Sequence, residues 1–228
     1  FGLLYSQQTS QSVVNICTIK ALMNISSSPD KAKETRKKIM DAAVNIFADK
    51  GYHDARVDEI VDASQTSKGA VYFHFPSKQK IFFAIIEQFV EVLERNLSAA
   101  IAREEHGVQR VDVALRTCLE TFQKYGNLAK IFLVQATGLG ESFEIKQAEI
   151  HTRFARMIQK HLDQAVKEGD IAPIDTEVAA FIWMGAINDV VMRWVRTGDP
   201  EPERVIPTLH TMLLRSIGIS EEKLKTLN

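Results

Sequence analysis

Apolar residues recur at intervals of three and four along nearly the whole chain after Pro29, and no useful stretch alternates between apolar and polar residues. Intervals of three and four place residues on one face of a helix, whereas alternation is the pattern of a strand. Glycines interrupt the pattern in the way that ends helices, beginning with Gly51. The sequence therefore predicts an all-α fold without internal repeats.

The helices divide the chain into two groups. Ser77, directly after Pro76, is a natural N-cap for a helix that runs to about Arg103, which at 1.5 Å per residue is roughly 40 Å long. This helix joins a three-helix domain at 29–76 to a larger helical domain at 77–218, with a tail at 219–228. We expect helices over residues 29–50, 57–63, 67–75, 77–103, 108–125, 127–138, 142–169, 175–197 and 202–217.

The composition narrows the class of protein. Hydrophobic residues make up 45% of the 228 residues and the net charge is −1, which is typical of a globular chain and excludes a polycation. Cys17 and Cys118 lie in no metal or redox spacing, and no run of about 18 apolar residues occurs. We therefore expect reduced thiols, no cofactor or metal, no membrane partner and a cytoplasmic location. Residues 1–28 carry no secretory pattern, and we interpret them as an N-terminal extension.

The segment SKGAVYFHFPSKQK, residues 67–80, contains three aromatic residues, one histidine and three lysines. In a helix, Val71 and Phe75 share a face and can pack on the preceding helices. The remaining side chains of this helix then stay available to a partner: Lys68, Tyr72, Phe73 and His74.

Two short helices joined by a three- to four-residue turn, the second carrying cationic and aromatic groups, are typical of a helix-turn-helix. Its second helix enters the major groove of DNA. Gly69 and Ala70 allow close approach of the backbone, and Phe73 is suited to a thymine methyl group. We assign phosphate contacts to Lys68, Tyr72 and His74.

Basic residues flank this unit. Lys78 and Lys80 lie in the first turn of a helix, where the helix dipole disfavours cations unless an anion such as a phosphate is bound. Lys37 belongs to a basic cluster in the first helix. Residues 29–80 carry ten Lys and Arg against eight Asp and Glu, whereas 81–228 carry seventeen against twenty-one. The charge is therefore biased toward the expected DNA-binding end.

Two motifs in this region resemble the DNA-binding domain of the tetracycline-repressor (TetR) family. The first is A-A-x-x-x-F-x-x-x-G-Y from Ala42 to Tyr52, and the second is S-K-G-x-x-Y-x-H-F-x-S-K from Ser67 to Lys78. The resemblance implies a homodimeric transcriptional regulator, usually a repressor, that a small molecule releases from a palindromic operator. The expected DNA-contacting residues are Lys37, Arg56, Ser67, Lys68, Gly69, Ala70, Tyr72, Phe73, His74 and Lys78.

The sequence departs from the family pattern in the helix-turn-helix. Arg56 replaces the Ser or Thr that usually caps the second helix, Gln65 replaces a turn glycine, and Thr66 replaces an apolar residue. A helical ligand-binding or adaptor protein without DNA binding therefore remains an alternative.

Residues 175–195 are apolar on nearly all sides, so this helix is expected to be buried on several faces. The resemblance implies that it lines an effector cavity and also packs against a second copy; plain monomer core is the alternative. The expected cavity residues are Phe132, Gln135, Phe154, Met157, Trp183 and Ile187. The expected dimer residues are Val190, Val191, Trp194, Ile206, Leu209 and Met212.

The segment GAINDVVMRW resembles the fatty-acid-responsive branch of the family, which makes a fatty acyl-CoA a candidate effector. We expect an effector among the C-terminal helices to shift the long helix and, with it, the DNA-reading helices. The histidines form no H-x-x-x-H pair and the chain has no G-x-S-x-G motif, which disfavours an enzyme. His151 and His161 are expected at the surface.

Overall fold

The structure is a computed structural model that describes residues 29–135 and 140–227, so the expected extension at 1–28 lies outside the described residues. Within those ranges the chain is helical and contains no strand, which confirms the predicted all-α class. The elements are α2 (Pro29–Asp54), α3 (Val57–Ser64), α4 (Lys68–His74), α5 (Lys78–Ile101), α6 (Gly107–Lys124), α7 (Gly126–Lys130), the π-helix η2 (Ile131–Gln135), α8 (Glu141–Lys167), α9 (Thr176–Thr197), α10 (Pro202–Ser216) and α11 (Glu221–Leu227).

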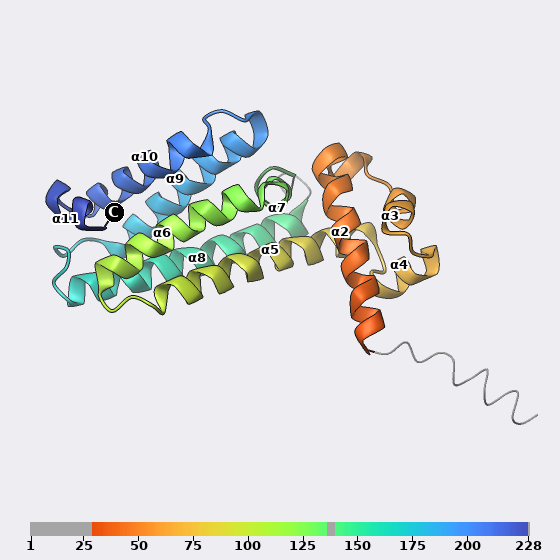
Figure 1. The fold of residues 1–228 in the computed structure, drawn as a ribbon, viewed down its shortest axis with the longest axis horizontal. Coiled ribbons are helices and arrows are strands. Elements are labelled where there is room, and N and C mark those ends of the chain that lie inside the picture. Colours follow the sequence, from red (N-terminus) through yellow and green to blue (C-terminus); the bar gives the residue numbers. More distant parts are fainter. Residues whose placement is uncertain (1–28, 136–139, 228) are drawn as a thin grey trace, which may run out of the picture.

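The helices form two groups connected by α5 (Figure 1). Helices α2, α3 and α4 gather at one end, while α6, α8, α9, α10 and α11 form the other group beside α5. The 24 residues of α5 give a length of about 36 Å. Phe82, near the start of α5, and Phe89, near its middle, are fully buried and belong to one continuous apolar core. The core therefore links the two groups without an intervening solvent layer.

Serine side chains cap two of the helices: Ser77 as the sequence predicts, and Ser67 in addition. The Ser77 hydroxyl accepts a hydrogen bond from the N–H of Lys80 (3.2 Å), and the Ser67 hydroxyl accepts one from the N–H of Ala70 (3.1 Å). At Gly51 the helical geometry of α2 breaks, with φ 81° and ψ 169°. Only glycine adopts such a conformation readily, so the predicted end of the first regular helix is confirmed.

The predicted helices differ from the structure in two places. The single helix expected over 127–138 is the short helix α7 followed by π-helical turns to Gln135, and residues 136–139 lie outside the described residues. The expected tail contains helix α11, whose Leu224 is buried. Lys223 of α11 also donates to the carboxylate and main-chain oxygens of Asp170, at 3.3 and 3.2 Å. The end of the chain is thus part of the larger helical group.

Candidate functional site

Helix α4 presents one side chain inward and several outward. Val71 is completely buried and Phe75 is 3% exposed, whereas Phe73 is 81% exposed and Tyr72 is 44% exposed. An exposed phenylalanine loses apolar burial that it would gain in a core, so its outward position favours a partner surface. The predicted inward and outward faces of this segment are confirmed.

The turn before α4 accommodates its unusual residues. Gln65 adopts the left-handed conformation, with φ 53° and ψ 38°, at the position where glycine is commonest. The hydroxyls of Ser64 and Thr66 share a hydrogen bond of 2.8 Å, so the polar Thr66 has a partner inside the turn. The turn therefore keeps the helix-turn-helix geometry without a glycine or an apolar residue at these positions.

Glu59 compensates for the missing cap at Arg56. The N–H of Arg56 donates to Oε2 of Glu59 at 3.0 Å, and Nζ of Lys50 lies 2.6 Å from Oε1. The hydrogen bond from Lys50, followed by the one from the Arg56 backbone, lowers the pKa of Glu59. Glu59 is thus held ionised at the start of α3, where a negative charge is favourable. Arg56 itself remains exposed.

Two of the expected phosphate-binding lysines lie at the surface in solvated ion pairs. Lys68 Nζ is 2.8 Å from Asp58, and Lys37 Nζ is 2.9 Å from Asp41, with every one of these side chains more than half exposed. Exposed pairs of this kind are weak, so a phosphate can replace either carboxylate at small cost. Both lysines remain suitable for DNA contact.

Lys78 has a different role from the one expected. Its ammonium donates to the main-chain oxygens of Tyr52 (2.7 Å), Ala55 (3.0 Å) and His53 (3.1 Å), and it lies 4.5 Å from the centroid of the Tyr52 ring. These contacts use all three N–H groups of a lysine. The carbonyls at the end of α2, rather than a phosphate, balance the charge at the start of α5. We therefore remove Lys78 from the DNA-contacting set.

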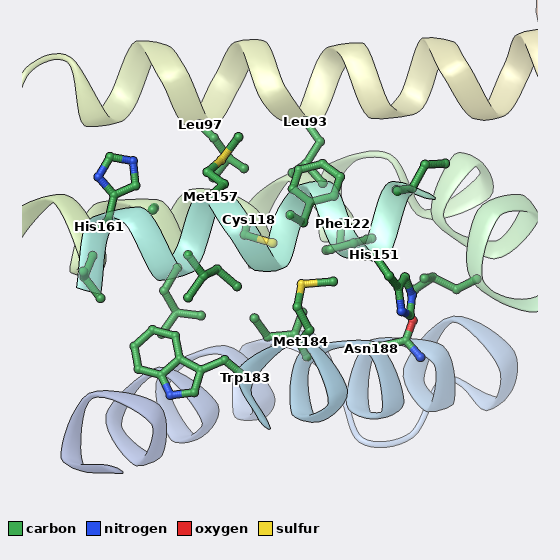
Figure 2. Close-up of a pocket in the computed structure, with 18 of the residues that line it drawn as sticks. Leu93, Leu97, Cys118, Phe122, His151, Met157, His161, Trp183, Met184 and Asn188 are labelled. Atoms are coloured by element: carbon green, nitrogen blue, oxygen red, sulfur yellow. The ribbon is translucent and has the colours of Figure 1, made fainter. Parts of the chain in front are cut away.

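The second candidate region is a cavity of about 80 Å³ between α5, α6, η2, α8 and α9 (Figure 2). Of the six residues expected there, Gln135 does not line the cavity, although its Oε1 is buried and has no partner among the described residues. The other five do line it: Phe132, Phe154, Met157, Trp183 and Ile187. The remaining lining residues are Leu93, Leu97, Val111, Ala114, Leu115, Cys118, Phe122, Leu133, Ile150, His151, Ile158, His161, Met184 and Asn188.

Three polar side chains line this apolar cavity, and the sequence reasoning missed them. His151 and His161 are half-buried rather than at the surface, and Asn188 is half-buried on α9. Burial lowers the pKa of both histidines, and the charges of Lys160 and Arg110 lower the pKa of His161 further. Phe154 and Met157 were predicted from their helical spacing, and His151 and His161 fall on the same face of α8 by that spacing. That shared face was the available signal.

The side chains that line the cavity give it an apolar character. Burial raises the pKa of the Cys118 thiol to about 12, so this thiol is protonated and unreactive. The Trp183 indole N–H is satisfied by the hydroxyl of Ser216 at 3.0 Å. No Lys, Arg, Asp or Glu is among the described residues that line the cavity. An apolar guest therefore fits this space better than an ion.

Most of the residues expected at the dimer surface are buried or half-buried within a single copy of the chain. Val191 is completely buried, and Trp194 and Leu209 are also buried. Val190 and Ile206 are half-buried, which leaves Met212, 63% exposed, as the outward member of the set. The interior face of α9 thus contains Val191 and Trp194, because it is continuous with the core face that runs from Ala180 through Trp183.

The opposite face of α9 is apolar and exposed. Val178, Phe181 and Ile182 are 51%, 53% and 59% exposed, and Gly185, one turn further on, has open space around it. These four residues share one helical face by their spacing. Helix α9 is also long and apolar enough to cross a membrane by length and composition. Because Trp183, Ile187 and Trp194 are buried among its neighbours, we interpret α9 as a core helix with one unpartnered face.

Two sets of contacts connect the cavity-bearing group to the helix-turn-helix group. Lys130 Nζ, at the end of α7, donates to the main-chain oxygen of Ala48 in α2 at 2.8 Å. Phe143, in the first turn of α8, stacks on Phe83 of α5 with 4.6 Å between ring centroids and packs edge-on against Tyr52 of α2 at 5.6 Å. Both connecting elements continue into the cavity wall, through η2 and through the middle of α8.

An outward aromatic and cationic helix on a helix-turn-helix, joined to a helical group with an apolar cavity, defines a DNA-binding regulator. The comparison with protein families agrees. Residues 39–85 match the profile of bacterial regulatory proteins of the tetR family, and residues 104–217 match that of the tetracyclin repressor-like C-terminal domain. The chain belongs to the TetR family of transcriptional regulators.

Individual relatives are distant. The chain is 27% identical over 176 residues to the HTH-type transcriptional regulator SrpR of Pseudomonas putida, which covers 76% of this chain and 81% of that protein. It is 23% identical over 162 residues to the fatty acid metabolism regulator protein of Bacillus subtilis, covering 69% and 81%. Both relatives are named as regulators.

Solved structures share the fold. A putative TetR-family regulator from Syntrophomonas wolfei superposes with a TM-score of 0.73 at 19% identity, covering 83% of this chain and 98% of that one. The regulator FadR from Bacillus subtilis, solved in complex with stearoyl-CoA, superposes with a TM-score of 0.70 at 21% identity, covering 81% and 99%.

Proposed function

We propose that this regulator is a repressor that binds a roughly palindromic DNA operator as a homodimer and is released by a small, largely apolar effector. The observation that carries the proposal is the outward edge of α4, where Phe73 is 81% exposed beside the exposed Tyr72 and Lys68. In the free protein the Phe73 ring exposes apolar area to water, and contact with a thymine methyl group in the major groove would cover that area. We place the protein in the cytoplasm, where its operator would be.

The DNA contacts follow from exposure. The exposed Lys37, Arg56 and Lys68 would supply cations, and Tyr72 and His74 would supply hydrogen-bonding groups on α4. Phosphate contacts hold the protein in register, and Phe73 contributes discrimination at a base. Gly69 and Ala70 carry little or no side chain, so the α4 backbone can approach the groove. Ser67 acts by capping α4 through its bond to Ala70.

The dimer would form through the exposed apolar face of α9 together with Met212 of α10. A two-fold dimer places the same patch on both copies, so Phe181 and Ile182 of one copy would face the equivalent side chains of the other. Burial of this patch removes apolar area that is otherwise exposed to water. The two copies of α4 would then lie about one DNA turn, ~34–36 Å, apart.

Release would use the two connections already described. An effector in the cavity pushes against Leu133 of η2 and Phe154 of α8, and these elements carry Lys130 and Phe143 at their other ends. Movement there would displace α2 and the start of α5, which position α4. The effector needs a higher affinity for the displaced state than for the DNA-bound state, since only such a difference shifts the population.

A fatty acyl chain is one candidate effector, because the apolar lining suits it and the FadR relative was solved with stearoyl-CoA. The charge-free lining would admit the acyl chain of such a ligand and leave its phosphates outside. The alternative function, an adaptor that no longer binds DNA, was suggested by the departures at Arg56, Gln65 and Thr66, but the turn keeps its geometry with these residues, so we prefer the repressor.

Fluorescence anisotropy with DNA from upstream of the gene, measured at several salt concentrations, tests the proposal. We expect nanomolar-range binding that weakens steeply with salt and exceeds binding to scrambled DNA. Equal and weak binding to both DNAs would favour the adaptor. Mass spectrometry of small molecules that co-purify with the native protein tests for an effector independently.

A further inference from the structure

We infer that the cavity takes an uncharged apolar molecule with a single hydroxyl group, of the phenol or small-alcohol class, and that this hydroxyl bonds to Nε2 of His151. The inference rests on the proposed function only in treating the cavity as an effector site. It adds the chemistry of the guest and the residue that selects it.

The nitrogen Nε2 of His151 is the atom in the cavity wall that indicates a ligand. This atom is buried and has no hydrogen-bond partner among the described residues. A buried polar atom without a partner is destabilising, so such atoms are rare unless a ligand or water completes them. A guest that offers one hydrogen-bonding group therefore gains from His151 as well as from the apolar walls.

A hydroxyl matches this nitrogen better than other groups do. Burial favours the neutral imidazole of His151, in which Nε2 either donates or accepts according to the tautomer. A hydroxyl can donate and accept, so it satisfies both tautomers. A carboxylate or an ammonium would bring a charge into a lining that contains no Lys, Arg, Asp or Glu among the described residues.

The position of Asn188 supports a polar end to the guest. In the view of Figure 2, His151 and Asn188 lie toward one end of the cavity and His161 toward the opposite end. The half-buried amide of Asn188 also lines the cavity and can hydrogen-bond to a polar group of the guest. The cavity therefore has polar side chains at both ends and apolar side chains between them, and His151 is the one of these whose buried nitrogen has no partner among the described residues.

The size of the cavity favours a compact guest. Its volume is about 80 Å³, and an apolar protein cavity of about 150 Å³ accepts benzene. Met157 and Met184 line the wall, and methionine side chains adjust their rotamers readily, so moderate expansion is available. With such expansion the cavity can admit a one-ring phenol, whereas a long acyl chain would require much larger movements.

Calorimetric titration of the purified full-length protein at neutral pH tests the inference with four probes: p-cresol, toluene, p-toluate and octanoyl-CoA. p-Cresol and toluene differ by one hydroxyl. We expect p-cresol to bind about tenfold more tightly than toluene, and p-toluate and octanoyl-CoA to bind more weakly than p-cresol. Equal binding of p-cresol and toluene, tighter binding of either of the other two probes, or no binding of any probe would overturn the inference.

Two histidine variants locate the hydroxyl site. In His151→Leu we expect the ratio of p-cresol to toluene affinity to fall to about one while toluene binding persists. The control His161→Leu alters the other cavity histidine and should retain the wild-type ratio. A ratio that survives in His151→Leu, or is lost only in His161→Leu, would contradict the assignment. Circular dichroism checks folding, and the wild-type ratio decides the question by itself if His151→Leu does not fold.

The failure of this inference is distinguishable from failure of the proposed function. The titration contains no DNA, so a protein that binds p-cresol selectively but no operator would keep the ligand assignment and lose the repressor. A protein that binds its operator but discriminates no hydroxyl would keep the repressor and lose this assignment.

Discussion

The ammonium nitrogen of Lys78 lies 2.7 Å from the main-chain oxygen of Tyr52 and also bonds to the two neighbouring carbonyls at the end of α2. These oxygens follow the break in helical geometry at Gly51, two of them in the last residues of α2 and one at Ala55 just beyond it, and the ammonium supplies their hydrogen bonds. The contact fixes α5 against α2, so a residue next to the DNA-reading unit acts on its internal geometry.

Replacement of Lys78 should therefore affect stability before it affects DNA. We expect Lys78→Ala to lower the free energy of unfolding by about 1–3 kcal/mol, because the α2 carbonyls lose their donors. DNA affinity should fall, but the slope of log affinity against log salt should stay at its wild-type value. Lys68→Ala is the matched control: we expect unchanged stability and a slope smaller by about one per protomer. A reduced slope in Lys78→Ala would return this residue to the phosphate-contacting set.

Substitution of Phe73 should reduce sequence preference without loss of stability. Phe73 is 81% exposed, so Phe73→Ala removes no core packing. We expect a loss of about 1–3 kcal/mol of discrimination at one base pair in each half-site, measured by competition with operators changed at single positions. The neighbouring Val71→Ala should instead destabilise the protein, because Val71 is completely buried. Unchanged preference in Phe73→Ala would exclude a base contact.

A charge on the exposed face of α9 should prevent dimer formation. Ile182→Glu would bury a carboxylate in the proposed interface, where it has no cation to pair with. We expect a monomer in sedimentation velocity at concentrations where the wild type is a dimer. The control is Ile145→Glu, on α8, because Ile145 is also exposed, at 54%, and lies on another helix. If Ile182→Glu stays dimeric, the interface lies elsewhere.

The buried pair formed by Asp112 and His210 should stabilise the larger helical group. Oδ1 of Asp112 lies 2.5 Å from Nε2 of His210, and the contact joins α6 to α10. We expect Asp112→Ala to cost about 3 kcal/mol in urea unfolding, since it leaves His210 buried without its partner. The double variant Asp112→Leu/His210→Leu should recover part of this loss. Additive effects of the two single changes would show that the pair contributes no coupling.

The lowered pKa of His161 makes a prediction about pH. Below its ordinary pKa of 6.5, the unfolded chain takes up a proton that the folded histidine resists, because burial, Lys160 and Arg110 disfavour its charge. The unfolding free energy should therefore decrease as pH falls through 6.5, and rise again on return to neutral pH. We expect the melting temperature of His161→Leu to depend less on pH than that of the wild type at the same protein concentration. The control His53→Leu replaces an exposed histidine and should follow the wild type.

The inward and outward faces of α4 could be predicted because they depend on local spacing. Val71 and Phe75 lie four residues apart, and that interval alone puts them on one side of α4 and leaves Phe73 on another. Five of the expected cavity residues were found for the same reason. Gln135 was misplaced because the backbone there winds as a π-helix, which rotates the side chains away from the α-helical register.

Local sequence determined the positions of the helices, the caps at Ser67 and Ser77, and the two faces of α4, since each depends on residues within a turn or two. Tertiary structure alone decided the partner of Lys78, the interior position of His151 and the outward face of α9. The sequence does not indicate which face of a helix is interior when the helix is apolar on every side, and it does not indicate the partner of a lysine at the start of a helix. Both are decided only when other helices, distant in sequence, pack nearby.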